Sequence, residues 1–340
     1  MGTITKGPLL EEQLRAFFLR AGYFVLRGVK VLHNGAEVTD IDLVLYSRAS
    51  PFKGLRTNVD VKNKRTPKAL ERIFWAKGLQ QVLGYDNCIV VTTDYRKDVV
   101  DYGKIHDVTV FDGRFVSQLS DQFKVVRSGA EPRLTEEALY KLFDISGDVV
   151  ENPWTNGLES AKNKLSGKIT FNVCNALLVD VQYFAEQFLA HKSHEEALTR
   201  AFYLTVSYFL LAVDWLGKDI SMLTFSERKD IYLRGFRYGS TYENFIKHLS
   251  SVTASLKNGE ATLREIQALM EKAGEEHKFE VLSEYCASAR FLSRAFGWSL
   301  KFEALAYAAT FTSMADLDVD LKSTIALLVD FFGIPRESVI

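Results

Sequence analysis

Two strand-like runs, residues 39–45 and 58–64, contain alternating charged and apolar side chains at 40–43 and 59–62, which is the pattern of two β-strands that each have a polar and an apolar face. On the first strand Asp42 points away from its apolar neighbours. On the second strand Asp60 and Lys62 share the polar face, because they are two residues apart. If the two strands pair in one sheet, these three side chains converge at one edge of it.

Two carboxylates and an amine at one point suit a particular chemistry. Carboxylate oxygens hold a hard divalent cation, and an ammonium group steadies an attacking water or the charge that develops in the transition state. The sequence therefore predicts a site for metal-assisted hydrolysis of a phosphodiester. Mg²⁺ or Mn²⁺ is the expected cation, since the ligands are oxygens.

The composition is that of a folded protein long enough for two domains, with 340 residues of which 47% are hydrophobic and 25% charged. The N-terminus has no apolar segment of the kind that marks a signal peptide. The longest apolar run, Ala201–Val213, is too short for a membrane span. The three cysteines, Cys88, Cys174 and Cys286, form no C-x-x-C pair, which argues against a zinc site or a disulfide framework. We expect a cytoplasmic protein without membrane contact.

Charge is divided unevenly along the chain. Residues 1–128 carry 20 Lys and Arg against 14 Asp and Glu, whereas the remainder carries 22 against 29. Nine basic residues fall between Arg48 and Lys77, around the expected site, against two acidic ones. Such a concentration indicates a polyanionic substrate, although many soluble domains carry a basic surface without that role.

Residues 1–128 predict an α/β domain with one mixed central sheet flanked by helices. Helical or alternating apolar spacing, a turn at 33–35 and a break at Gly22 set its elements. The expected helices are 9–21, 68–83, 98–103 and one that ends near 123, and the expected strands are 23–32, 39–45, 58–64, 88–93 and 108–111. Residues 48–54 are expected to form a loop between the two acidic strands.

Residues 128–135 contain Gly, Pro and polar side chains and are the expected linker. Beyond it the strand patterns disappear, and apolar residues recur with helical spacing. Helices are expected in the segments 136–143, 172–190, 194–216, 225–234, 242–257, 262–273, 279–296, 302–315 and 321–332. A second, all-α domain is therefore predicted over residues 135–340.

A set of short motifs follows in a fixed order through the first domain. They are Glu11 on the first helix, eleven residues before Gly22-Tyr23; Thr39-Asp40-Ile41-Asp42-Leu43 and Asp60-Val61-Lys62 on the acidic strands; Val90-Val91-Thr92-Thr93 at the end of a buried strand; and Val110-Phe111-Asp112-Gly113 at the end of the last strand. Each motif alone is common, whereas the ordered set at these spacings is fairly specific.

In this order the motifs resemble the PD-(D/E)xK, or restriction-endonuclease-like, nuclease superfamily over residues 8–120. The Mrr-type restriction endonucleases are the most similar branch, followed by the archaeal Holliday-junction resolvases. The resemblance implies a restriction-endonuclease-like α/β fold for the first domain. One departure is the loop at 47–54, which is longer than the minimal form. Another is Asp60, which stands where the Mrr type often carries Gln and which favours metal binding.

The resemblance also implies roles for individual residues. Asp42 and Asp60 would be catalytic and would bind Mg²⁺ or Mn²⁺, and the carbonyl of Val61 would be a third ligand. Lys62 would position the attacking water, and Glu11 would complete the metal shell or bind a second ion.

Further candidates lie close to these residues in sequence. Gln80, on the helix that follows the second acidic strand, would be a catalytic polar residue. Lys64, Arg65 and Lys68 would contact the nucleic acid. For each of these side chains an ordinary solvent-facing position explains the sequence equally well.

Two acidic residues compete with these assignments. The phase of the first helix does not separate Glu11 from Glu12, and an acidic residue in a first turn is favoured by the helix dipole alone. Asp40 lies on the same face as Asp42. It is either an outer ligand or a strand-end residue that bonds locally.

The expected activity is that of a metal-dependent endonuclease that hydrolyses phosphodiester bonds in DNA. Duplex DNA is favoured, a homodimer would be needed to cut both strands, and the resemblance suggests restriction or antiviral defence. The acidic helical domain is a poor surface for DNA and would dimerise, regulate or bind a partner protein. The alternative is a catalytically inactive nucleic-acid-binding or scaffold module on a nuclease fold, with the helical domain as its protein-interaction unit.

Overall fold

The computed structural model describes residues 6–64, 68–126, 133–143, 152–256, 258–275 and 279–340. The chain divides into two compact units. Unit 1 comprises Met1–Lys168 together with the short segment Tyr307–Thr310, and unit 2 comprises Ile169–Ala306 and Phe311–Ile340. Each unit is described by itself.

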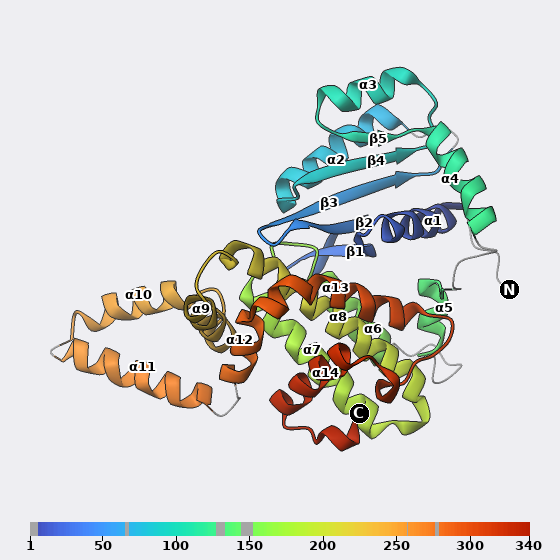
Figure 1. Ribbon diagram of the computed structural model, residues 1–340. Coiled ribbons are helices and arrows are strands. Elements are labelled where there is room, and N and C mark those ends of the chain that lie inside the picture. Colours follow the sequence, from blue (N-terminus) through green and yellow to red (C-terminus); the bar gives the residue numbers. More distant parts are fainter. Residues whose placement is uncertain (1–5, 65–67, 127–132, 144–151, 257, 276–278) are drawn as a thin grey trace. The chain divides into compact units, whose positions relative to one another are not determined.

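Unit 1 is built around a five-stranded sheet (Figure 1). Its strands, which lie side by side in chain order, are β1 (Phe24–His33), β2 (Ala36–Ser50), β3 (Lys53–Lys62), β4 (Asn87–Thr92) and β5 (Thr109–Phe111). The pairs β1–β2 and β2–β3 are antiparallel, and β3–β4 and β4–β5 are parallel. The predicted mixed α/β sheet is therefore present.

The sequence predicted the turn between β1 and β2 correctly, but not the turn between β2 and β3. Asn34 and Gly35 both have positive φ, 50° and 82°, as a two-residue turn of type I′ requires. The loop expected at 48–54 is wrong, because Arg48 still pairs with Gly54 and only two residues separate β2 from β3. Polar and exposed side chains made this stretch resemble a loop, whereas its backbone continues the ladder.

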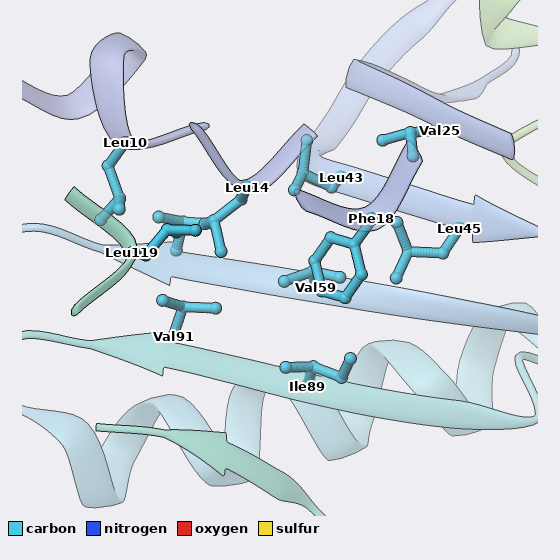
Figure 2. Packing of buried hydrophobic residues seen from close by; sticks show 11 residues of the cluster. Leu10, Leu14, Phe18, Val25, Leu43, Leu45, Val59, Ile89, Val91 and Leu119 are labelled. Carbon is cyan, nitrogen blue, oxygen red and sulfur yellow. The ribbon is translucent and has the colours of Figure 1, made fainter. Parts of the chain in front are cut away.

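Helices cover both faces of the sheet. They are α1 (Lys6–Arg20) and α4 (Gly113–Val126) on one face, and α2 (Ala69–Leu83) and α3 (Lys97–Ile105) on the other. Figure 2 shows the first face, where Leu14 and Phe18 of α1 pack against Val59 of β3 and its neighbours. The second face is a smaller cluster that includes Ile73 of α2.

Strand alternation decides which face each side chain of β3 occupies. Val59 and Val61 belong to the cluster under α1 and α4. Asn58 and Asp60, which alternate with them, are buried without belonging to that cluster and therefore point toward the face covered by α2. This alternation carries the acidic residue of the second motif away from the apolar core of Figure 2.

Unit 1 extends past the expected boundary at 128–135, most of which lies outside the described residues. The helices α5 (Glu136–Lys141) and α6 (Pro153–Asn163) belong to unit 1, not to a second domain that begins at 135. Glu136 explains part of this, because it accepts a bond from Arg27 Nε of β1 at 2.9 Å and one from Lys162 Nζ of α6, also at 2.9 Å. The ion pairs thus join α5 and α6 to the sheet.

A second set of contacts joins the residues after α6 to the sheet. Arg56 donates to the carbonyl oxygen of Ser166 at 3.0 Å, and the Tyr85 hydroxyl donates to the same oxygen at 2.7 Å. The Tyr46 hydroxyl donates to the carbonyl of Leu165, also at 2.7 Å. The guanidinium of Arg56 lies 4.4 Å from the ring of Tyr85. The spacing of apolar residues along the sequence does not predict such contacts between residues that are far apart in the chain.

Unit 2 is helical, as predicted. Its helices are α7 (Phe171–Ala190), α8 (Glu195–Ile220), α9 (Phe225–Tyr238), α10 (Tyr242–Thr253), α11 (Gly259–Glu275), α12 (Phe279–Ala287), α13 (Ala289–Tyr307) and α14 (Val319–Phe332). Within the described part of the chain, one helical segment, Lys192–Ile220, is long and apolar enough to cross a membrane. Its most apolar window is 94% buried in the protein, as in the core helix of a soluble domain.

One expected helix, 279–296, is two helices in the structure. Ser288 stands between α12 and α13, and its hydroxyl accepts a bond from the backbone N–H of Phe291 at 3.2 Å, which caps the second helix. The helix expected over 302–315 is also wrong, since α13 ends at Tyr307. Apolar spacing continues across both points, so periodicity alone could not locate the breaks.

Candidate metal centre

The candidate site lies where β2 and β3 stop pairing. Their last paired residues are Leu43 and Val59, so Asp42 and Asp60 come next on facing strands. Beyond this point Asp42 Oδ2 accepts a hydrogen bond from the backbone N–H of Val61 at 2.6 Å. The side chain therefore takes over a position that a strand carbonyl would fill in a continued ladder.

A pocket of about 200 Å³ opens at this end of the two strands. Its lining residues come from β2, β3 and α2: Thr39, Asp40, Ile41, Asp42, Asn58, Val59, Asp60, Lys62, Arg72, Trp75 and Leu79. The three residues that strand alternation brought together, Asp42, Asp60 and Lys62, are all among them. The arrangement places two carboxylates and a primary amine at one polar hollow.

Arg72, on the first turn of α2, forms an ion pair with the carboxylate of Asp60. Its Nε donates to Oδ2 at 2.8 Å, and its Nη2 donates to Oδ1. Asp60 is buried, and the pair has the two-pronged geometry that arginine and carboxylates favour. Each carboxylate oxygen keeps a second lone pair, so a cation at Asp60 would have to share these oxygens with the guanidinium or displace it.

Opposing effects act on the pKa of the Asp42 carboxyl. Burial raises the pKa of this carboxyl, while the Val61 N–H and the positive charges of Lys62 and Arg72 act to lower it. The neighbouring Asp40 acts to raise it further. The cost of burying this charge is only partly offset by its neighbours, so a nearby cation would stabilise the ionised carboxylate, as expected of a metal ligand.

Glu11 of α1 interacts electrostatically with the same site. Burial and, after it, repulsion by Asp42 raise the pKa of Glu11 from 4.5 to about 7, with Arg27 opposing the change. Two carboxylates that repel each other in a partly buried place are typical of a cation site.

Glu12, the competitor of Glu11, has a structural role. It is buried, its Oε1 lies 3.3 Å from Arg27 Nη1, and the same oxygen accepts a bond from the backbone N–H of Glu136 at 3.3 Å. The phase of α1 thus assigns Glu12 to the ion pairs between α1, β1 and α5. Glu11 does not line the pocket, and its link to the site is its electrostatic interaction with Asp42.

Several sequence-based candidates lie elsewhere. The amide of Gln80 donates to the carbonyl of Asp86 at 2.8 Å and accepts from the Cys88 thiol at 3.4 Å, so it is engaged at the start of β4 and not in the pocket. Lys64 and Lys68 are exposed outside the pocket lining, and Lys68 pairs with Glu71 at 3.3 Å.

Two further predictions concern the backbone of Val61 and the side chain of Arg65. The contact that Val61 makes with the site is through its N–H, whereas a carbonyl ligand was expected. Arg65 lies outside the described residues.

Sequence analysis missed the contribution of α2. Arg72, Trp75 and Leu79 stand at i, i+3 and i+7, which is one stripe of a helix, and all three line the pocket. The signal was a mixed charged and apolar stripe beside the buried face formed by Ala69, Ile73 and Ala76. In the sequence alone, that stripe is indistinguishable from the solvent-facing side of a helix, because the strand that it faces is not known.

The donor set fits a magnesium-type ion. Within the described ranges no three His, Cys, Asp or Glu side chains lie close enough together to enclose a metal. Mg²⁺ and Mn²⁺ do not need such an enclosure, because they keep several waters and take one or two carboxylates. Asp42 and Asp60, which face one pocket, meet that requirement once Arg72 has moved.

Comparison with known proteins finds no match: no protein-family model, no curated protein and no solved structure matches the chain.

Proposed function

We propose that this protein is a Mg²⁺- or Mn²⁺-dependent endonuclease that hydrolyses phosphodiester bonds in DNA, on a restriction-endonuclease-like fold. One observation carries the proposal: Asp42 and Asp60 follow the last pair of a β-ladder and face a single polar pocket that also holds Lys62. The order of strands and helices in unit 1 supports the same fold.

The residues divide the work as follows. Asp42 and Asp60 would hold the cation, which supplies Lewis-acid polarisation of the phosphate and a more acidic water when bound. Lys62 orients the nucleophilic water and stabilises negative charge on the phosphoryl oxygens. Glu11, whose pKa is raised by burial and by Asp42, would add negative charge to the cation's surroundings.

Arg72 has two partners in this proposal. It neutralises the carboxylate of Asp60. If a cation were held by that carboxylate, the guanidinium would stand beside the pocket and could pair with a phosphate oxygen of the substrate. The same side chain would then serve both the carboxylate and the DNA backbone.

The substrate class rests on charge. Unit 1 carries 25 Lys and Arg against 21 Asp and Glu, whereas the rest of the chain carries 17 against 22, so unit 1 is the better surface for a polyanion. Other parts of the proposal rest on the sequence alone and on the resemblance. They are dimerisation, regulation or partner binding by unit 2, a cytoplasmic location and a role in antiviral defence.

A second function is favoured by one observation. Both oxygens of Asp60 are engaged by Arg72, as in a permanent structural ion pair. If that pair never opens, the protein is a nucleic-acid-binding module on a nuclease fold and has no catalytic cation. The two functions differ in whether a divalent ion changes anything.

Cleavage assays of the full chain test the proposal. Supercoiled plasmid and a single-stranded DNA circle are incubated with the protein in Mg²⁺, Mn²⁺ or EDTA, beside Asp42→Asn and Lys62→Ala. Matched controls are Asp98→Asn and Lys104→Ala, which change the same residue types on the surface of α3. The proposal predicts metal-dependent cutting by the wild type and by both controls, and none by the two site variants. Equal cutting by the site variants would contradict it.

A further inference from the structure

One aromatic side chain stands in the pocket without an assigned role. Trp75 lines the pocket together with Asp42, Asp60 and Lys62, yet 47% of its surface is exposed. Exposure of so large an apolar side chain costs free energy, since burying it would remove that surface from water. The guanidinium of Arg72 lies over the ring, and the rest of the indole is open to a ligand beside the pocket.

The surroundings of Trp75 indicate what kind of ligand this is. The guanidinium carbon of Arg72 lies 5.7 Å from its ring, and Lys62 lines the same pocket. A planar, apolar surface next to clustered positive charge is complementary to a nucleotide, whose base is flat and whose phosphate is negative.

The helix that carries Trp75 offers an internal comparison. The neighbouring Phe74 is also exposed, at 62%, but it projects from the other flank of α2. There its ring packs edge-on against Tyr102 of α3 at 5.8 Å and lies near His106, which directly follows α3, and it does not line the pocket. Trp75 is therefore the aromatic side chain of α2 that a nucleotide in the pocket would meet.

We propose that Trp75 is a stacking platform for an unpaired base next to the phosphate that is cut, so that the substrate is DNA with a single-stranded segment at the cleavage point. The inference rests on the proposed function, because it places the scissile phosphate at Asp42, Asp60 and Lys62. In a duplex each base is covered above and below by its neighbours and offers only its edges to a protein. A base can lie flat on an indole only when it is unpaired or flipped out.

Binding in EDTA tests this inference without requiring cleavage. The full chain is titrated into a fluorescein-labelled mixed-sequence single strand and into its blunt duplex, and anisotropy is recorded for the wild type, Trp75→Ala, Trp75→Phe and Phe74→Ala. Stacking predicts that Trp75→Ala weakens single-strand binding by roughly tenfold to a hundredfold. Duplex binding should hardly change, Trp75→Phe should retain most of the affinity, and Phe74→Ala should behave as the wild type.

Tryptophan fluorescence gives an independent signature. Trp154 and Trp298 are buried and Trp215 is half-buried and outside the pocket lining, whereas Trp75 is open to solvent in the pocket. Base stacking should therefore quench the emission of the wild type and not that of Trp75→Phe. Equal weakening of single-strand and duplex binding by Trp75→Ala, an equal loss in Phe74→Ala, or no binding of the single strand would overturn the inference.

The two proposals can fail separately. Binding that depends on Trp75, without cutting in any metal, would leave the stacking site and reject the nuclease. Cutting that depends on Asp42 and Lys62 but is indifferent to Trp75→Ala, on single-stranded and duplex DNA alike, would leave the nuclease and reject the stacking site.

Discussion

The guanidinium of Arg72 donates to both carboxylate oxygens of Asp60, with its Nε at 2.8 Å from Oδ2. This pair links the helix α2 to the strand that carries the second acidic motif. It also sets a competition, because the oxygens that would bind a cation are the ones that bind the arginine.

Replacement of Arg72 by Gln should strengthen cation binding and weaken catalysis. The cation no longer has to displace a charge-assisted pair, so the Kd for Mn²⁺ measured by calorimetry should fall by roughly tenfold to a hundredfold. DNA cleavage should nevertheless slow, since the phosphate loses a partner. Unchanged or weaker Mn²⁺ binding would show that Arg72 and the cation do not compete for Asp60.

The pH dependence of stability should reveal Glu11. Burial and repulsion by Asp42 raise its pKa from 4.5 to about 7, so between these values the folded protein holds a proton that the unfolded chain has lost. The stability of the metal-free protein therefore falls as pH rises from 4.5 to 7, and Glu11→Gln should remove that part of the fall.

The measurement is the difference in Tm between wild type and Glu11→Gln in EDTA, at pH 5 and at pH 8. The variant should gain relative to the wild type at pH 8. Glu71→Gln is the matched control, because Glu71 is an exposed glutamate of α2, and it should show the same difference at both pH values. A Glu11→Gln protein that is no more stable at pH 8 would contradict the account.

Glu136 should be a main stabilising residue of unit 1. Its burial acts to raise the pKa of the carboxyl, but Lys162 and Arg27 outweigh this and leave it lowered. The stabilisation is therefore full above the unfolded value of 4.5 and is lost as pH falls below it. Glu136→Gln should cost about 1–3 kcal/mol of unfolding free energy at pH 7, because Lys162 and Arg27 each lose one carboxylate while Lys162 keeps Glu159 and Arg27 keeps Glu12.

Denaturant unfolding at pH 7 and at pH 3 checks this prediction. The loss caused by Glu136→Gln should shrink at the lower pH. Glu137→Gln serves as the comparison, because its side chain is 44% exposed although it also pairs with Arg27, and the substitution should cost less than about 1 kcal/mol. Equal losses in the two variants would mean that burial of the pair does not set its contribution.

The sequence predicted the strands of the site better than its helix. Alternation with a period of two placed Asp42, Asp60 and Lys62 at one pocket, because a strand has only two faces. A helix has a continuous surface, so the role of Arg72 and Trp75 depended on how α2 turns against the sheet. That rotation is fixed by Ile73 and its buried neighbours and is visible only in the folded chain.

Other differences have the same origin in contacts between distant residues. Arg27 of β1 is a partner of Glu12, a contact between distant residues that the phase of α1 in the sequence could not indicate. The place of α5 and α6 in unit 1 depends on Glu136 and Lys162, which local composition at 128–135 could not indicate. Gln80 was chosen from helix spacing alone, and its amide bonds the backbone at Asp86 instead.

The central claim is that Asp42 and Asp60 bind one cation together, and Mn²⁺ titration followed by electron paramagnetic resonance tests it most directly. The variants are Asp42→Asn, Asp60→Asn, the double variant and the surface control Asp98→Asn. The account predicts that each single substitution removes most of the binding, that the double variant loses little more, and that the control binds as the wild type does. Unchanged Mn²⁺ binding in both single variants, or losses that add in the double variant, would contradict a shared site.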